Sequence, residues 1–173
     1  TLNGLGARTI GTPMGYESHL RMPLADWARV QAALRGVVRD DAGIVARLRS
    51  VKSAAEVAKI TQACAIAGRA FARVPQIARV GVPLSQVFRD FQRLCLEEGA
   101  DWVPYLAGGA AQGGYGDVIS PASDAPLVAG DVLMLDTGLV WDGYFCDFDR
   151  NFSLGPSDAQ TEAAHARLIE AVD

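Results

Sequence analysis

The segment that decides the fold is LDTGLVWDGYFCDFDR, residues 135–150. At its centre, Asp142-Gly143 is a strong signal for a two-residue β-hairpin, because both residues tolerate the positive φ angles of a type I′ turn. This turn sets the antiparallel pairs as 141 with 144, 140 with 145, 139 with 146, Gly138 with Asp147 and Asp136 with Asp149. The sequence therefore predicts an antiparallel hairpin over about residues 131–154.

Three acids of this hairpin share one face of the predicted sheet. Side chains alternate along a strand, so Asp136, Asp147 and Asp149 project to the same side. Asp136 and Asp147 are diagonal neighbours, about 7–8 Å apart at the backbone, and their carboxylates can reach one or two metal ions between them. The preceding run, residues 132–135, is apolar on both faces and favours a covered strand, where uncompensated carboxylates are costly. The residues alone leave two interpretations open, a metal or catalytic site and an exposed polar face.

Residues 130–138 and 143–150 resemble the signature of the pita-bread hydrolases, which include aminopeptidase P, prolidase, methionine aminopeptidase and creatinase. The metallopeptidases of that family carry one metal-ligand Asp in such a strand and a second eleven residues later. Asp136 and Asp147 match these positions. The resemblance implies that they bind two divalent metal ions (manganese, cobalt or zinc). Asp149, where the family commonly has Thr or Ser, and Arg150 are expected to support the ligands.

A second match lies upstream, in LRSVKSAAEV, residues 48–57. It is similar to the segment that opens the catalytic domain in the aminopeptidase P and creatinase branch, and Ser53 with Glu56 forms a helix-starting capping box. The resemblance implies an α+β pita-bread fold that is only partly present. Residues 1–46 would be the end of an amino-terminal domain, and residues 47–173 the first half of the catalytic domain.

The remaining elements follow from periodicity and turn residues. We expect helices over about 24–34, 41–49, 53–77 and 85–98, a last helix opened by a Ser157–Gln160 capping box, and strands near 8–10, 37–38 and 102–106. Residues 107–126, rich in Gly, Ala, Ser and Pro, predict a loop. Its glycine-rich part, 108–114, lacks the Lys-Ser/Thr of a phosphate-binding loop and favours the border of a substrate pocket.

Composition narrows the class of protein. The chain has 173 residues, half of them hydrophobic, and a net charge of −4, which argues against a nucleic-acid binder. It contains no apolar run of membrane-spanning length and no signal-peptide pattern. We therefore expect a cytoplasmic protein without a nucleic-acid or membrane partner. The three cysteines, Cys64, Cys95 and Cys146, are expected to be buried reduced thiols.

The resemblance also shows what this sequence lacks. The family's dinuclear site uses one His and two Glu far downstream of the second Asp, and this sequence ends 26 residues after Asp147. We therefore expect a fragment that is inactive alone, with the catalytic residues unknown. Family peptidases also carry a His about seventeen residues before the first Asp. In this chain, Ile119 stands near that position. His19 and His165 are expected to be structural.

The leading hypothesis is a metal-dependent hydrolase of an amide bond, similar to an Xaa-Pro peptidase, acting on a peptide or small amide as a homodimer. One alternative, favoured by the missing His, is a creatinase-like or cyclic-amide hydrolase of C–N bonds with the same fold. Another is a non-catalytic peptide-binding module. Asp136 and Asp147 count against the module, because such domains typically lose the ligand acids.

Overall fold

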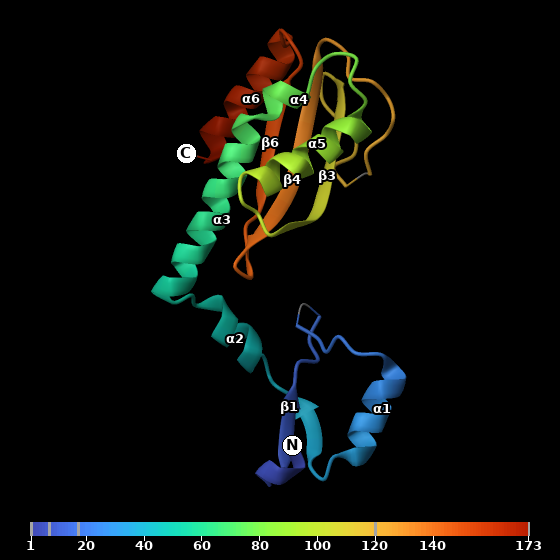
Figure 1. Cartoon of the computed structure of the whole chain (residues 1–173), viewed down its shortest axis with the longest axis vertical. Helices are drawn as coiled ribbons and strands as arrows, with labels where there is room; N and C mark the ends of the chain where they lie inside the picture. The colour runs from blue at the N-terminus through green and yellow to red at the C-terminus, as the bar shows by residue number, and fades with distance from the viewer. Residues whose placement is uncertain (1, 7, 17, 120, 173) are drawn as a thin grey trace. The chain divides into compact units, whose positions relative to one another are not determined.

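The computed structural model describes residues 2–6, 8–16, 18–119 and 121–172. The chain forms two compact units that divide in sequence between Ser53 and Ala54. Figure 1 shows the elements of each unit coloured along the chain.

The first unit is built on a pair of parallel strands, β1 (Thr9–Thr12) and β2 (Val37–Asp40), connected by α1 (Leu24–Ala33). Parallel strands need such a crossover. A short 3-10 helix, η1 (Leu2–Leu5), precedes them, and α2 (Ile44–Ser50) follows. The Asp41 carboxylate accepts hydrogen bonds from the backbone N–H groups of Gly43 and Val45, at 2.9 and 3.0 Å, and so satisfies donors at the start of α2. The predicted strands and helices of this region are confirmed.

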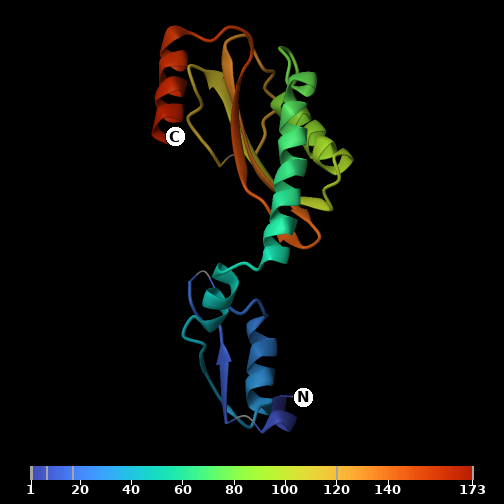
Figure 2. The same ribbon diagram turned by 90° about the vertical axis from the view of Figure 1, so that its left-hand side faces the viewer.

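The second unit has the predicted helix–helix–strand–hairpin order. Its elements are α3 (Ala54–Ala72), α4 (Val74–Ile77), α5 (Leu84–Glu97), β3 (Trp102–Gln112), β4 (Asp131–Trp141), β5 (Tyr144–Phe145), β6 (Phe148–Ser153) and α6 (Ala159–Val172). Strand β4 lies between β3 and β6 and is antiparallel to both. Figure 2 shows α3 and α5 on one side of this sheet and α6 on the other.

The hairpin has the predicted turn and register. Asp142 and Gly143 have φ angles of 47° and 78°, as a type I′ turn requires. The observed pairs include 141 with 144, 140 with 145 and 136 with 149. Cys146 and Asp147 belong to neither β5 nor β6, so the ladder is interrupted where Gly138 was predicted to pair with Asp147. The observed pairs on both sides of this interruption have the predicted register.

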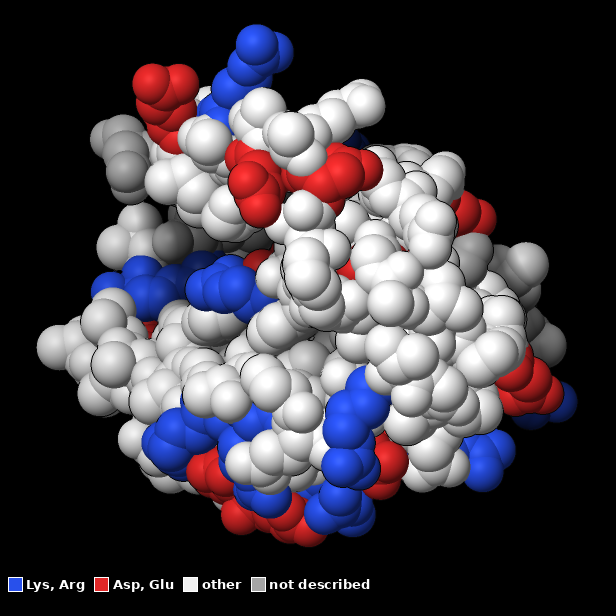
Figure 3. All heavy atoms as spheres, turned by 90° about the horizontal axis from the view of Figure 1, so that it is seen from above, with Lys and Arg blue, Asp and Glu red and all other residues white. Residues whose placement is uncertain are grey.

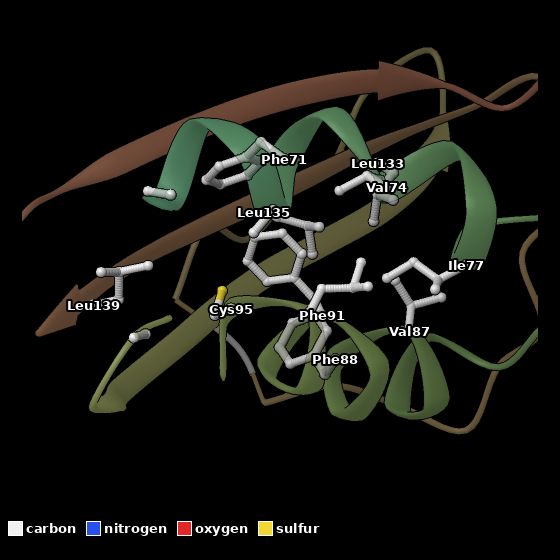
Figure 4. Close-up of a cluster of buried hydrophobic side chains, with 14 of the residues drawn as sticks. Phe71, Val74, Ile77, Val87, Phe88, Phe91, Cys95, Leu133, Leu135 and Leu139 are labelled. Atoms are coloured by element: carbon white, nitrogen blue, oxygen red, sulfur yellow. The ribbon is translucent and has the colours of Figure 1, made fainter. Parts of the chain in front are cut away.

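The core lies between α3, α5 and one face of the sheet (Figure 4). Leu133, Leu135 and Leu139 of β4 have no exposed surface, and the ring centres of Phe71 (α3) and Phe91 (α5) lie 4.7 Å apart in the same core. Cys95 and Cys146 are buried in this core as free thiols, whereas Cys64 is half-buried. Burial raises the pKa of Cys95 to about 12, which makes it a poor nucleophile.

The predicted loop over 107–126 is wrong in its first part, because β3 continues to Gln112. The glycine-rich composition has a packing cause: a Cβ on Gly108 would lie 2.2 Å from the Met134 carbonyl oxygen across the ladder. Residues 108–112 therefore belong to the sheet, whereas Gly113 and Gly114 follow it and line a cavity. The helix predicted over 53–77 is also divided, into α3 and α4.

The capping box predicted for the last helix is wrong as well. The Thr161 backbone N–H donates to the Asp158 carboxylate at 2.7 Å, so Asp158 is the capping residue. The Ser157 hydroxyl instead donates to Glu162 at 3.1 Å. The side chain that caps the helix is therefore that of Asp158, one position later than the predicted Ser157.

Among the described residues, no helix has both the length and the hydropathy needed to cross a bilayer. The face drawn in Figure 3 carries acidic and basic side chains, which are mixed along its lower edge, around a largely uncharged area.

Candidate metal centre

Strand β4 divides its side chains between two environments. The odd-numbered leucines face α3 and α5, whereas Asp136 and Gly138 lie on the opposite face. Asp149 pairs with Asp136 and so shares this face. We call it the open face of the sheet; α6 covers only the part of it near Val132. The predicted common face of Asp136 and Asp149 is therefore confirmed.

Tyr105 brings the two candidate ligands together. Its hydroxyl oxygen lies 2.6 Å from one oxygen of Asp147 and 3.2 Å from one oxygen of Asp136. A hydroxyl has one hydrogen, so it donates to one carboxylate at a time, and the shorter distance favours Asp147. Two carboxylates from the two arms of the hairpin thus converge on a single oxygen.

The three acids crowd negative charge onto the open face. The pKa of Asp149 is raised, first by burial and then by the negative charges of Asp136 and Asp147, while Arg150 opposes the shift. Burial and the hydrogen bond to Asp147 raise the pKa of Tyr105, so its hydroxyl keeps its proton at neutral pH. A cation is the natural counter-charge for such a group of acids.

The donor chemistry fits part of a metal site. Carboxylate oxygens are ligands that hard divalent ions prefer. Within the described residues, however, no three His, Cys, Asp or Glu side chains form a cluster able to hold a metal ion. Asp136 and Asp147 therefore account for only part of a coordination shell.

Arg150 and Asp149 have different surroundings. The Arg150 guanidinium lies 4.9 Å from the centre of the Phe148 ring and donates to the Asp149 carbonyl oxygen at 2.6 Å. Alternation along β6 puts Arg150 on the face of Phe148, opposite that of Asp149. Its contact with the acid group is thus through the backbone of Asp149.

The two histidines lie elsewhere. His19 is in the first unit, where its ring Nδ1 is 3.3 Å from the Tyr16 carbonyl oxygen. His165 is exposed on α6 and lines a cavity of about 440 Å³ between α6 and the sheet. Neither Asp136 nor Asp147 lines that cavity.

Polar contacts tie the hairpin turn to α3. The Tyr144 hydroxyl donates to Glu56 at 3.1 Å, and the Lys59 ammonium lies 2.7 Å from the Asp142 carboxylate and 5.2 Å from the Tyr144 ring centre. Glu56 belongs to the second sequence motif, for which the sequence indicated only a capping role. This residue thus connects the first turn of α3 with the hairpin that carries the acids.

Tyr105 is the site residue that sequence reasoning missed. The sequence predicted a strand over 102–106, but simple alternation from Trp102 places Tyr105 on the other face. A shift of register between these two residues puts it beside the acids. Finding Tyr105 would have required the pairing register of β3 with β4, and the long connection between these strands gives no sequence signal for that register.

The open-faced sheet, its covering helices and the paired acids define this unit as a partial pita-bread domain. The chain belongs to metallopeptidase family M24, whose sequence profile matches residues 58–173. Among curated proteins, none shows a significant match.

Solved structures agree with this assignment. The X-Pro aminopeptidase from Thermotoga maritima MSB8 is 26% identical, with a TM-score of 0.80 over 98% of this chain and 47% of its own. Dipeptidase PepE from Mycobacterium ulcerans is 27% identical, with a TM-score of 0.77 over 96% and 44%. Prolidase from Pyrococcus furiosus, 19% identical with a TM-score of 0.74 over 95% and 47%, supports the fold alone. The chain spans somewhat less than half the length of these proteins.

Proposed function

We propose that the complete protein, meaning the natural polypeptide that contains these 173 residues, is a metal-dependent peptidase acting on Xaa-Pro bonds. The observation that carries this proposal is the convergence of Asp136 and Asp147 on the Tyr105 hydroxyl. Family membership and the two structures above 25% identity, an X-Pro aminopeptidase and a dipeptidase, support it.

In this proposal, Asp136 and Asp147 hold two divalent ions, with manganese, cobalt and zinc as the candidates. When bound, the ions would polarise the scissile carbonyl and lower the pKa of water. The carboxylates supply hard negative oxygens from the two arms of the hairpin, and the protonated Tyr105 hydroxyl orients the Asp147 carboxylate. The remaining ligands and the group that moves protons would come from outside the described residues.

The first unit fits the end of an amino-terminal domain in this proposal, and residues 47–173 the first half of the catalytic domain. Asp149 would adjust the charge around the ligands, and Arg150 would fix the backbone of Asp149. The homodimer implied by the family resemblance stays a prediction.

One observation favours a second candidate, a hydrolase of C–N bonds in small amidines or cyclic amides. Ile119 stands near the place where family peptidases carry a His, and its side chain is 80% exposed. An apolar side chain there can neither bind a substrate carboxylate nor stabilise developing charge, so the peptide chemistry would need another residue.

Hydrolysis assays separate the candidates. The complete protein, loaded with manganese, cobalt or zinc, is expected to release Xaa from Xaa-Pro dipeptides and to lose this activity in Asp136→Asn. Turnover of cyclic amides without turnover of dipeptides would favour the second candidate. Metal-independent peptide binding without turnover of either substrate would support a binding module. The 173-residue chain assayed by itself is expected to be inactive.

A further inference from the structure

Strand β3 contains a β-bulge immediately before Tyr105. Trp102 pairs with Val140, but Tyr105 pairs with Gly138, so three steps along β3 correspond to two along β4. The extra residue lies in the stretch that contains Pro104. Proline cannot donate to a ladder, and bulges are one of the few places in a sheet that accept it.

The bulge decides which way Tyr105 faces. Trp102 pairs with a residue of the open face, so an unbroken strand would turn Tyr105 toward α3 and α5. One extra residue returns Tyr105 to the open face, beside Asp136 and Asp147. Bulges of this kind re-aim a side chain, and they are frequent next to active sites.

Thr137 holds the strand where the bulge ends. This residue of β4 is fully buried on the core face, and its hydroxyl donates to the Tyr105 carbonyl oxygen at 2.6 Å. The Gly138 carbonyl is farther away, at 3.3 Å. A buried hydroxyl therefore bonds to the first residue of β3 after the bulge. The core face of β4 is otherwise leucine at positions 133, 135 and 139, so a polar side chain there needs a specific reason.

We propose that Thr137 and the bulge act as one positioning device, which aims the Tyr105 hydroxyl at Asp136 and Asp147. Thr137 is the positioning residue: it acts from the core face through the Tyr105 backbone, and the Tyr105 hydroxyl in turn orients the Asp147 carboxylate, with Asp136 beside it. The consequence for metal affinity rests on the proposed function, whereas the placement of Tyr105 does not.

The test uses the complete protein with four variants. Thr137→Val removes the hydroxyl at nearly constant volume, Thr137→Ser keeps the hydroxyl, Tyr105→Phe removes the second contact, and a double variant combines Thr137→Val with Tyr105→Phe. Manganese affinity is measured by the paramagnetic resonance signal of free Mn²⁺, and metal-free crystal structures give the distance from the Tyr105 hydroxyl to Asp147.

Losing a group that orients a ligand typically lowers metal affinity about 10–100-fold. We expect a loss in that range for Tyr105→Phe and for Thr137→Val, near-normal affinity for Thr137→Ser, and no further loss in the double variant. Non-additivity would show that the two residues act in series. In the metal-free Thr137→Val structure, the Tyr105 hydroxyl should lie beyond hydrogen-bond distance of Asp147.

Two results would overturn the device: losses that multiply in the double variant, or a Tyr105 hydroxyl that stays in place in the metal-free Thr137→Val structure. Failure of the proposed function looks different. Asp136→Asn and Asp147→Asn would then leave manganese binding unchanged, and the metal-free structures would still decide whether Thr137 positions Tyr105.

Discussion

The two faces of β4 have different tasks, although they alternate residue by residue along one strand. Leu133, Leu135 and Leu139 fill a closed apolar core against α3 and α5. Asp136, between them in sequence, faces Asp149 across the ladder and the Tyr105 hydroxyl. The comparison teaches that the core face sets the position of the strand and that the open face uses this rigidity to hold charged groups in fixed places.

Thr137 is the exception that connects the two faces. It has the burial of a core residue, yet it forms a hydrogen bond to the strand segment that carries Tyr105. The two faces are therefore separate in chemistry but mechanically linked. Substitutions on the core face should change stability, and substitutions of acids on the open face should change metal binding with little change in stability.

The largest effect is expected for Leu135→Ala on the core face. Leu135 has no exposed surface, and truncating such a side chain typically costs about 2–5 kcal/mol because a cavity remains. Urea unfolding measures the loss. Leu96→Ala is the matched control, since Leu96 is 52% exposed and its truncation should cost far less. Equal losses in the two variants would contradict the closed core.

Gly138→Ala should have the next largest effect, because here the open face is itself closely packed. A Cβ on Gly138 would lie 2.0 Å from Cζ of Phe145 and 2.1 Å from the Cys146 carbonyl oxygen. Overpacking of this kind costs about 1–3 kcal/mol. The same substitution at Gly116, where a Cβ has no neighbour within 4 Å, is the control. A Gly138 variant as stable as the wild type would show that the hairpin yields easily at this point.

A smaller effect is expected for Lys59→Met at the hairpin turn. Lys59 pairs with Asp142 at 2.7 Å on a partly exposed surface, and such pairs contribute little. The melting temperature should fall slightly at low salt, and the difference from the wild type should shrink in about 1 M salt, where charges are screened within about 3 Å. A difference that persists at high salt would indicate that the contact of the Lys59 ammonium with the Tyr144 ring matters more than its ion pair with Asp142.

The smallest effect concerns the start of α6. The hydrogen bond from the Thr161 backbone lowers the pKa of Asp158, so this acid stabilises the helix above its unfolded pKa of about 3.9 and stops doing so as the pH falls through the lower folded value. Hydrogen exchange of residues 159–172 should accelerate over that acidic range. Asp158→Asn keeps a capping side chain but does not titrate, and should remove this pH dependence. A wild-type profile that matches the variant would exclude the Asp158 cap.

The sequence predicted the hairpin, its turn and its register because they depend on local chemistry. Asp142-Gly143 adopts positive φ angles, and the period of two then places Asp136 opposite Asp149. The extent of β3 was not predictable in the same way. Its Gly-Ala run looks like a loop, and only the close approach of Gly108 to the Met134 backbone explains those residues within a strand.

The candidate site was predicted only in part, because some of its residues depend on local patterns and others on long-range pairing. Asp136 and Asp147 were found from spacing and resemblance. Tyr105 was missed because its orientation depends on one extra residue in β3, and no local pattern announces that bulge. The sequence placed the cap of α6 at Ser157, one position too early, because Ser157 and Asp158 are both good capping residues, and the structure selects Asp158.

The central claim is that Asp136 and Asp147 bind metal ions from the open face of β4. Its most direct test is the manganese content and affinity of the complete protein, compared with Asp136→Asn, Asp147→Asn and the control Asp142→Asn, which removes the same charge from the same hairpin. The account predicts that each of the first two variants loses affinity by at least about 100-fold, the upper end of what supporting residues contribute, while the control binds as the wild type does. Full manganese occupancy in both Asp136→Asn and Asp147→Asn would contradict it.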